Sequence, residues 1–433
     1  MAVATVTGPV IDLGELRHEP EPARLPRPSR ANGRPLRCAL VLLLALVTLA
    51  AAGPPTRRAV VTLPARLGAD VMVAGDLFLV IDPITPQTPQ RRLAAFRLPG
   101  GEPVWQAPLP AQGRYWGVTP LAGMLLVTGY EMDSEGRGTL TVALDRATGA
   151  YRWQQPGRAS ELADGNLLLY SGGEDEPVSM RAVDPCCGTV RWQLTGTRGE
   201  VNYRDSGHGV DRVVFSRANG PIEVRDATTG AVLARTDARP TGGGAYTTVQ
   251  LIDDLVLTVG GAPSMVTAYG LDRLDQRWRT PADEALYPVD CGPVICLQTQ
   301  SRGIRAVDRA TGQQVWSSDR WGWVWPHAGE LVATMLSSAG PGSEQLVVLD
   351  PWTGRVLADL DRWELAGSDP GAPMIGLRRH PNGGLLVAEL DVRAGTARVL
   401  DVLPDASGLC QASVDRLLCR RSDGSYGLWQ LPD

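Results

Sequence analysis

The feature that most constrains this chain is a short pattern that recurs along its length. The copy from Ala306 to Trp316 has the sequence AVDRATGQQVW. Asp308 favours a turn because its carboxylate can accept hydrogen bonds from backbone N–H groups two or three residues later. Gly312 can adopt the positive φ that a tight hairpin needs, and Trp316 offers a large apolar contact to a neighbouring unit. The pattern therefore predicts two short strands joined by a turn.

Variants of this pattern begin at positions 97, 145, 184, 226, 270, 308, 350 and 391. Two of them have Arg97 and Gly270 in place of the Asp, and those beginning at 226, 350 and 391 lack the Trp. A period near 40 residues with about four short strands per period is typical of propeller blades. The predicted blade turns contain the pairs Asp145 and Gly149, Asp184 and Gly188, Asp226 and Gly230, Asp308 and Gly312, Asp350 and Gly354, and Asp391 and Gly395.

The repeat predicts an all-β fold over residues 69–433, a β-propeller of four-stranded blades. After the copy that begins at Asp391, the chain has sequence for only three further strands. We expect Val60–Leu67 to supply the fourth strand and close the ring. The literal count is then eight full cycles plus a shared ninth. Because propellers typically have four to eight blades, we predict eight, with one cycle degenerate.

The region before the repeats has three parts. Residues 1–37 form a Pro- and Arg-rich tail that is too polar to form a core and is expected to be disordered. Residues 38–55 contain the one long apolar run, which is either a transmembrane helix or a signal peptide with a cleavage site near Ala50–Ala52. Residues 56–68 form a linker and the candidate closing strand. The excess of Arg before the run predicts a cytoplasmic N-terminus and an extracytoplasmic propeller.

Composition and motifs argue against several classes of function. A net charge of −5 and a pI near 5.6 provide no basic face for nucleic acid. The chain contains no Lys, which excludes Schiff-base chemistry and a phosphate-loop Lys. His208, His327 and His380 lack metal-ligand spacing, and no Ser lies in a G-x-S-x-G motif. We therefore expect no catalytic residue, metal or cofactor, and a structural role for the recurring Asp residues.

Six cysteines follow the apolar run. Cys291 and Cys296 flank a predicted tight turn, and Cys410 and Cys419 occupy similar positions in the final blade. Each pair is placed to face across a hairpin, within disulfide distance. Buried free thiols are the alternative, but an oxidising compartment favours disulfides. The adjacent pair Cys186–Cys187, in a predicted blade turn, is a third candidate.

The copies ALDRATG…YRW and AVDRATG…QVW resemble the pyrroloquinoline-quinone-type repeat, over about residues 69–431. Quinoprotein alcohol dehydrogenases, which hold a quinone and Ca²⁺ in a central funnel, share this repeat with non-enzymatic propellers such as the subunit of the outer-membrane protein assembly machinery. The dehydrogenases stack a vicinal disulfide on the quinone, whereas Cys186–Cys187 is predicted in an outer turn, away from the funnel. The chain therefore resembles the non-enzymatic group more closely. In both groups the repeat Trp docks one blade against the next, a role that the resemblance implies for Trp105, Trp153, Trp192, Trp278 and Trp316.

One aromatic stretch, WGWVWPH, departs from the repeat. Strand alternation predicts that Trp321, Trp323 and Trp325 lie on one face, with His327 beside them, on the innermost strand of a blade. Packing between blades is one interpretation. The other is a surface that binds a sugar or peptide, because an exposed face of three Trp side chains is costly without a ligand.

These observations predict a single-pass membrane protein that displays a non-catalytic propeller outside the cytoplasm. Propellers offer rigid faces with variable loops, so we expect a binding or assembly scaffold with a protein or glycan partner. A quinone-dependent dehydrogenase and a ligand sensor with a cytoplasmic tail are the alternatives.

Overall fold

The computed structural model describes residues 40–41, 43, 60–83, 90–110, 113–132, 137–172, 177–197, 199–217, 220–237, 246–282, 285–299, 303–335, 344–368, 372–381 and 383–431. The chain divides into two compact units, Met1–Arg58 and Ala59–Asp433. The predicted tail, and nearly all of the predicted membrane segment at residues 38–55, lie outside the described residues. Within the described ranges, no helix is both long and apolar enough to cross a membrane.

The second unit consists of β-strands in its described residues. In chain order they are β1 (Val60–Leu63), β2 (Asp70–Ala74), β3 (Leu77–Ile81), β4 (Arg92–Arg97), β5 (Glu102–Pro108), β6 (Gly113–Leu121), β7 (Met124–Met132), β8 (Arg137–Asp145), β9 (Tyr151–Pro156), β10 (Arg158–Glu161), β11 (Leu167–Ser171), β12 (Val178–Val183), β13 (Val190–Thr197), β14 (Gly199–Asp205), β15 (Val210–Arg217), β16 (Ile222–Asp226), β17 (Val232–Thr236), β18 (Tyr246–Ile252), β19 (Leu255–Gly260), β20 (Met265–Gly270), β21 (Gln276–Pro281), β22 (Ala285–Cys291), β23 (Val294–Thr299), β24 (Ile304–Asp308), β25 (Gln314–Ser318), β26 (Trp321–His327), β27 (Glu330–Met335), β28 (Glu344–Leu349), β29 (Val356–Leu365), β30 (Gly367–Ser368), β31 (Ile375–Arg379), β32 (Leu385–Asp391), β33 (Thr396–Leu403), β34 (Ala406–Ala412), β35 (Arg416–Arg421) and β36 (Tyr426–Gln430).

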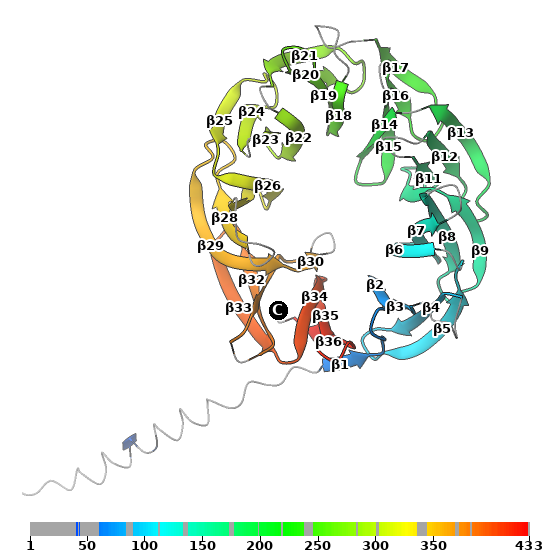
Figure 1. Ribbon diagram of the computed structural model, residues 1–433, viewed down its shortest axis with the longest axis vertical. Coiled ribbons are helices and arrows are strands. Elements are labelled where there is room, and N and C mark those ends of the chain that lie inside the picture. The colour runs from blue at the N-terminus through cyan, green and yellow to red at the C-terminus, as the bar shows by residue number, and fades with distance from the viewer. Residues whose placement is uncertain are drawn as a thin grey trace, which may run out of the picture. The chain divides into compact units, whose positions relative to one another are not determined.

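Six of the sheets contain four consecutive strands each, from β2–β5 to β22–β25, and all their pairings are antiparallel. These sheets follow one another around a ring, with the first strand of each towards the centre and the fourth at the outside (Figure 1). This arrangement confirms the predicted all-β propeller. In the antiparallel order, the turn between strands one and two and the turn between strands three and four lie at the same edge of a blade.

Burial follows this radial order. Strand β3, the second of its blade, has the sequence LFLVI and is buried at every position, because neighbouring blades cover both of its faces. Strand β5, the fourth of the same blade, is largely exposed. Buried clusters join adjacent blades, as where Leu79 and Ile81 pack with Leu125 and Val127. The core therefore lies between the blades.

The seven-stranded sheet contains two repeat units. Strand β29 pairs with β28 through most of its length, and then Glu364 and Leu365 pair with β31. A bulge at the buried Leu360, followed by Asp361 with a φ of 69°, allows this change of partner. The described residues thus form eight hydrogen-bonded sheets, and the seven-stranded one combines two repeat units.

The two ends of the repeat array meet in the remaining sheet. Strand β1 pairs antiparallel with β36, and Val61 lies opposite Leu428. Leu63 is fully buried, and a Cβ atom added to Gly101 in the first blade would lie 3.1 Å from its Cδ2 atom. Strand β1 therefore completes the last blade and packs against the first.

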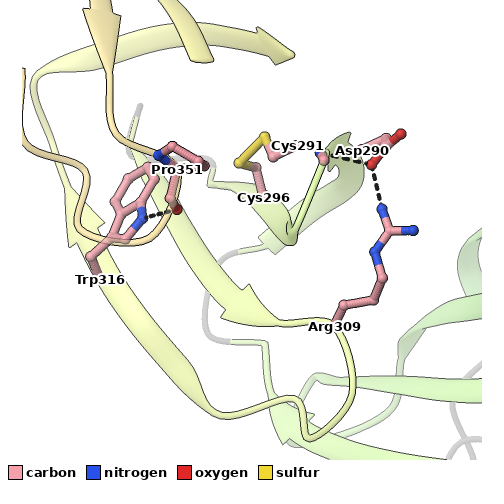
Figure 2. The surroundings of a disulfide bond; sticks show 7 residues. Asp290, Cys291, Cys296, Arg309, Trp316 and Pro351 are labelled. Atoms are coloured by element: carbon pink, nitrogen blue, oxygen red, sulfur yellow. Dashed lines mark hydrogen bonds and ion pairs between the residues drawn. A yellow bond between two sulfur atoms is a disulfide. The ribbon is translucent and has the colours of Figure 1, made fainter. Parts of the chain in front are cut away.

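Each repeat Trp lies on the turn of the following blade. Its indole N–H donates a hydrogen bond to the carbonyl of the residue after the turn Asp or its equivalent, as Trp316 does to Pro351 at 2.8 Å (Figure 2). The ring also packs on the turn Gly, so that a Cβ added to Gly312 would lie 2.4 Å from Trp278. The other donors are Trp105 to Arg146, Trp153 to Pro185, Trp192 to Ala227 and Trp278 to Arg309, at 2.8–3.2 Å.

Both predicted hairpin disulfides are confirmed. Cys291 and Cys296 bridge β22 and β23, and Cys410 and Cys419 bridge β34 and β35. Figure 2 shows the first beside Arg309, whose guanidinium pairs with Asp290 of the same blade and with Asp253 of the preceding blade. The adjacent pair Cys186–Cys187 consists instead of two exposed free thiols.

Candidate functional site

The aromatic stretch forms β26, the first strand of its blade, but its three Trp side chains do not share a face. The register against β27 shifts between Trp321 and Trp323, so Gly322 is an extra residue. Such a bulge interrupts the strict alternation of a strand. Trp321 is only 2% exposed and packs in the cluster that contains Val324 and the Cys291–Cys296 disulfide. The expectation of one face with three Trp side chains is therefore wrong.

The bulge belongs to the repeat. Strands β6, β18 and β22 have the same register shift near their beginning, and each is also the first strand of a blade. In β26 the carbonyl of Gly322 accepts a hydrogen bond from the Gln298 side chain of the neighbouring blade, at 3.1 Å. The fold thus holds Trp323 in place.

Trp323 is the exposed aromatic residue of this strand. Its side chain is 52% exposed, and its ring lies 6.2 Å from that of Tyr287 on β22, at an interplanar angle of 41°. Burial raises the pKa of the Tyr287 phenol from its ordinary value of 10.0. Two aromatic rings from adjacent blades therefore form one platform.

Beside this platform lies a groove of about 500 Å³, hereafter the Trp323 groove. It extends from β22 and β26 to β28 and the end of β29. Trp325, partly buried, packs with Trp363 and Leu346 in one apolar cluster. The lining of the Trp323 groove includes Trp323, Trp325, Leu346, Trp363, Leu365 and the two exposed carboxylates Glu344 and Glu364.

Trp363 is fixed from two sides. Its indole N–H donates to the carbonyl of Leu360 at 2.6 Å, and the guanidinium of Arg378 lies over the ring, 4.1 Å from its centroid. Arg378 also pairs with Asp361 at 2.9 Å. These contacts hold the end of β29 that passes to the next repeat unit, so the change of strand partner shapes one wall of the Trp323 groove.

The Trp323 groove carries negative charge. Among its described lining residues, Glu344 and Glu364 are the charged groups, and no basic side chain lines it. Apolar walls lower the local dielectric and increase the attraction of these carboxylates for a cation. The Trp323 groove is thus suited to a ligand that carries an apolar group beside a positive charge.

Comparison with known proteins identifies the family of the repeat. A family model described as outer membrane protein assembly factor BamB matches residues 89–253 and 218–366. The chain belongs to this family. The resemblance to a pyrroloquinoline-quinone-type repeat, on the side of the non-enzymatic assembly subunit, is confirmed. No curated protein matches the sequence.

Solved structures similar to this BamB-family chain are remote in sequence. BamB from Moraxella catarrhalis is 14% identical, with a TM-score of 0.44 over 87% of this chain and 97% of that one. The computationally designed Ika8 protein is 17% identical, with a TM-score of 0.45 over 74% of this chain and 96% of that one. The C-terminal WD40 domain of Sif2 is 11% identical, with a TM-score of 0.41 over 86% of this chain and 99% of that one.

Of the residues singled out in the sequence, the structure brings only Trp323 and Trp325 to the Trp323 groove. Trp321 is in the core, His327 is at the far end of β26, and the blade-docking Trp residues lie on outer strands. Sequence reasoning missed Tyr287, Trp363 and the two carboxylates. Trp363 carried a signal, since it lies outside the repeat register: the repeat places its Trp eight residues after the Asp, and Trp363 lies further along from Asp350.

The Trp323 groove offers no set of ligands for a metal. Among the described residues, the one group of carboxylate and thiol ligands close enough to share an ion is Asp184, Cys186 and Cys187, on a blade turn. The recurring turn carboxylates are engaged by their own backbone, as where Asp145 Oδ1 accepts from the N–H groups of Ala147 and Thr148, both at 3.0 Å.

Proposed function

We propose that this chain is a non-catalytic binding scaffold that recognises a protein partner through the Trp323 groove. The main support for the proposal is the position of Trp323. This residue follows a β-bulge in β26, is half exposed and lies at the edge of an apolar groove. Exposed apolar patches mark interaction sites, and Trp residues often dominate the binding energy of an interface.

The chemistry of the Trp323 groove favours an extended peptide segment with an apolar side chain and a neighbouring Arg or Lys. The apolar side chain would contact Trp323 and Trp325, and the cation would pair with Glu344 or Glu364. The family description names a protein assembly factor, which favours a protein partner over a glycan. A glycan remains an outcome that the binding experiment below distinguishes.

A quinone-dependent dehydrogenase has weaker support. The recurring carboxylates are engaged in turns, and Cys186–Cys187 lies between the two outer strands of its blade, not at the centre where the dehydrogenases bind their quinone. We expect no dye reduction when pyrroloquinoline quinone, Ca²⁺ and an alcohol are added to the purified chain. Turnover that disappears in Trp323→Ala would contradict the proposal.

We further propose that residues 38–55 anchor the chain in a membrane, with the N-terminus in the cytoplasm and the propeller outside it. The Arg excess before this segment supports the orientation, and the two hairpin disulfides are typical of an oxidising compartment. A reporter that is active only in the cytoplasm, fused to the C-terminus, should give no signal. A strong signal would reverse the topology.

The binding proposal is tested with two equally exposed Trp residues. Trp323 is 52% exposed in the groove, and Trp352 is 50% exposed on a blade turn. Proteins bound to the full chain are isolated from its native membrane and identified by mass spectrometry for the natural protein, Trp323→Ala and Trp352→Ala. We expect Trp323→Ala to lose a protein that Trp352→Ala retains, at unchanged melting temperature. Equal recovery from both variants would contradict the proposal, and loss of a saccharide alone would assign the groove to glycans.

A further inference from the structure

A second chemical site lies on the turn between β12 and β13. In the turns that begin at Asp145 and Asp308, the second and third residues after the Asp are Ala and Thr. In the turn that begins at Asp184, the same two positions are Cys186 and Cys187. Both cysteines are exposed, and neither belongs to a buried cluster. Burial therefore does not explain the presence of two sulfur atoms here.

The turn does not need the sulfur atoms for its shape. In four other turns the Thr hydroxyl donates a hydrogen bond to the turn Asp, at 2.8–3.0 Å. Cys187 takes the place of that Thr. Asp184 accepts from the backbone N–H of Cys186 at 2.9 Å and pairs with Arg191 at 3.1 Å, as Asp145 does with Ala147 and Arg152. The turn therefore carries two exposed thiols where its counterparts carry other side chains.

We propose that Asp184, Cys186 and Cys187 bind a thiophilic divalent metal ion of the Zn²⁺ class. One ligand atom from each residue lies within 4.8 Å of the other two. Paired thiolates select soft and borderline ions over Mg²⁺ and Ca²⁺. Three protein ligands leave the fourth position of a tetrahedral ion to water or to a ligand from another molecule.

A small movement of the side chains is sufficient to admit the ion. The two Sγ atoms are 2.6 Å apart, whereas two Zn–S bonds of about 2.3 Å in a tetrahedral site place the sulfurs roughly 3.8 Å apart. Both side chains are exposed and can rotate apart. The hydroxyl of Thr189, 3.2 Å from the Cys187 sulfur, is placed to hold a metal-bound thiolate.

The proposal is tested by metal binding to the reduced full chain, with Cd²⁺ as the probe. Cd²⁺ bound to thiolates gives an ultraviolet charge-transfer band that carboxylates do not produce. We expect one Cd²⁺ per chain with this band, and its displacement by Zn²⁺. The hairpin disulfides are buried, and alkylation of a separate sample of the reduced chain, followed by mass spectrometry, verifies that they stay intact.

The matched variant restores the sequence of the other turns. Cys186→Ala with Cys187→Thr rebuilds the Ala-Thr pair, so it should fold with at least the natural stability and lose the band. Asp184→Asn keeps the turn acceptor but removes the charge, and should weaken Cd²⁺ binding by about tenfold or more while the band persists. An equal band in the Ala-Thr variant, which retains Cys38, or no band in the natural chain, would overturn the proposal. So would a Cys186–Cys187 disulfide that survives reduction.

Discussion

At the scale of the residue, the propeller is held together by one contact that recurs between neighbouring blades. A Trp ring packs flat on a turn Gly while its N–H donates to the same turn. Where the Trp is absent, a smaller residue takes its place, as Ala358 does against Gly395. Neighbouring side chains also change the pKa of the turn Asp. Hydrogen bonds from Arg152 and Thr148 lower the pKa of Asp145 to about 2.

We expect Gly312→Ala to be more destabilising than its backbone conformation alone explains. Its φ is 70°, and its new Cβ would lie 2.4 Å from Trp278. Gly123 is the matched control, since it has a φ of 73° and no atom within 4 Å of an added Cβ. Gly312→Ala should lower the free energy of unfolding by about 1–3 kcal/mol more than Gly123→Ala does. Equal losses in denaturant titrations would mean that the Trp does not need the Gly.

The lowered pKa of Asp145 leads us to expect a loss of stability in acid. Its pKa is lower in the folded state, near 2, than the ordinary value of 3.8. A depressed pKa stabilises the fold above the unfolded value, and this contribution disappears as the pH falls from about 4 to about 2. Asp145→Asn keeps an acceptor for the turn but cannot titrate. We expect its melting temperature to fall less steeply over this interval than that of the natural chain. Parallel curves would show that Asp145 contributes nothing to acid sensitivity.

At the scale of the element, the sequence predicted the hairpins but not their irregularities. The Asp-to-Gly spacing and the Cys pairs depend on local geometry, which the sequence encodes directly. The bulge at Gly322 recurs at the start of other first strands, but the Asp-to-Trp pattern does not include that position. The change of partner along β29 depends on the next repeat unit, so no local pattern revealed it. As a result, Trp321 lies in the core and not on the predicted surface. Trp363 and Tyr287 belong to the candidate site although the sequence did not predict it. The sequence grouped Trp323 with Trp321 and Trp325, and of these two only Trp325 lines the same groove.

The two disulfides should stabilise their hairpins to a similar extent. They close short loops, with sequence separations of five and nine residues. The entropy of closing loops of this size corresponds to about 2–3 kcal/mol each. Replacing either pair by Ala should lower the free energy of unfolding by about that amount, with slightly more for Cys410 and Cys419. Denaturant unfolding measures both, and a change below about 0.5 kcal/mol would mean that packing alone holds these strands.

At the largest scale, the second unit is a closed ring in which the first and last strands, β1 and β36, share one blade. The period near 40 residues was sufficient to predict this closure, because three leftover strands need a fourth. Strand β1 pairs with β36 and buries Leu63 against the first blade. The number of sheets was harder to predict, because β29 joins two repeat units through contacts that no repeat pattern contains.

Because β1 closes the ring, we expect two Leu residues four positions apart to differ widely in how much their replacement by Ala destabilises the fold. Leu63 is fully buried, whereas Leu67 is 75% exposed. Leu63→Ala should lower the free energy of unfolding by about 2–5 kcal/mol and increase hydrogen exchange in both β36 and β2. Leu67→Ala should change neither by more than about 0.5 kcal/mol. Exchange confined to β1 in Leu63→Ala would mean that the propeller does not depend on its closing strand.

The central claim is that the Trp323 groove receives a protein partner, and one measurement tests it most directly. A photo-crosslinking amino acid with an aromatic side chain, which keeps a ring where Trp323 supplies one, is placed at position 323, or at the equally exposed position 352, in the full chain in its native membrane. After irradiation, we expect a discrete protein adduct from position 323 and none from position 352. Addition of a basic, Trp-binding competitor peptide should reduce that adduct. No adduct from position 323, or the same adducts from both positions, would contradict the account.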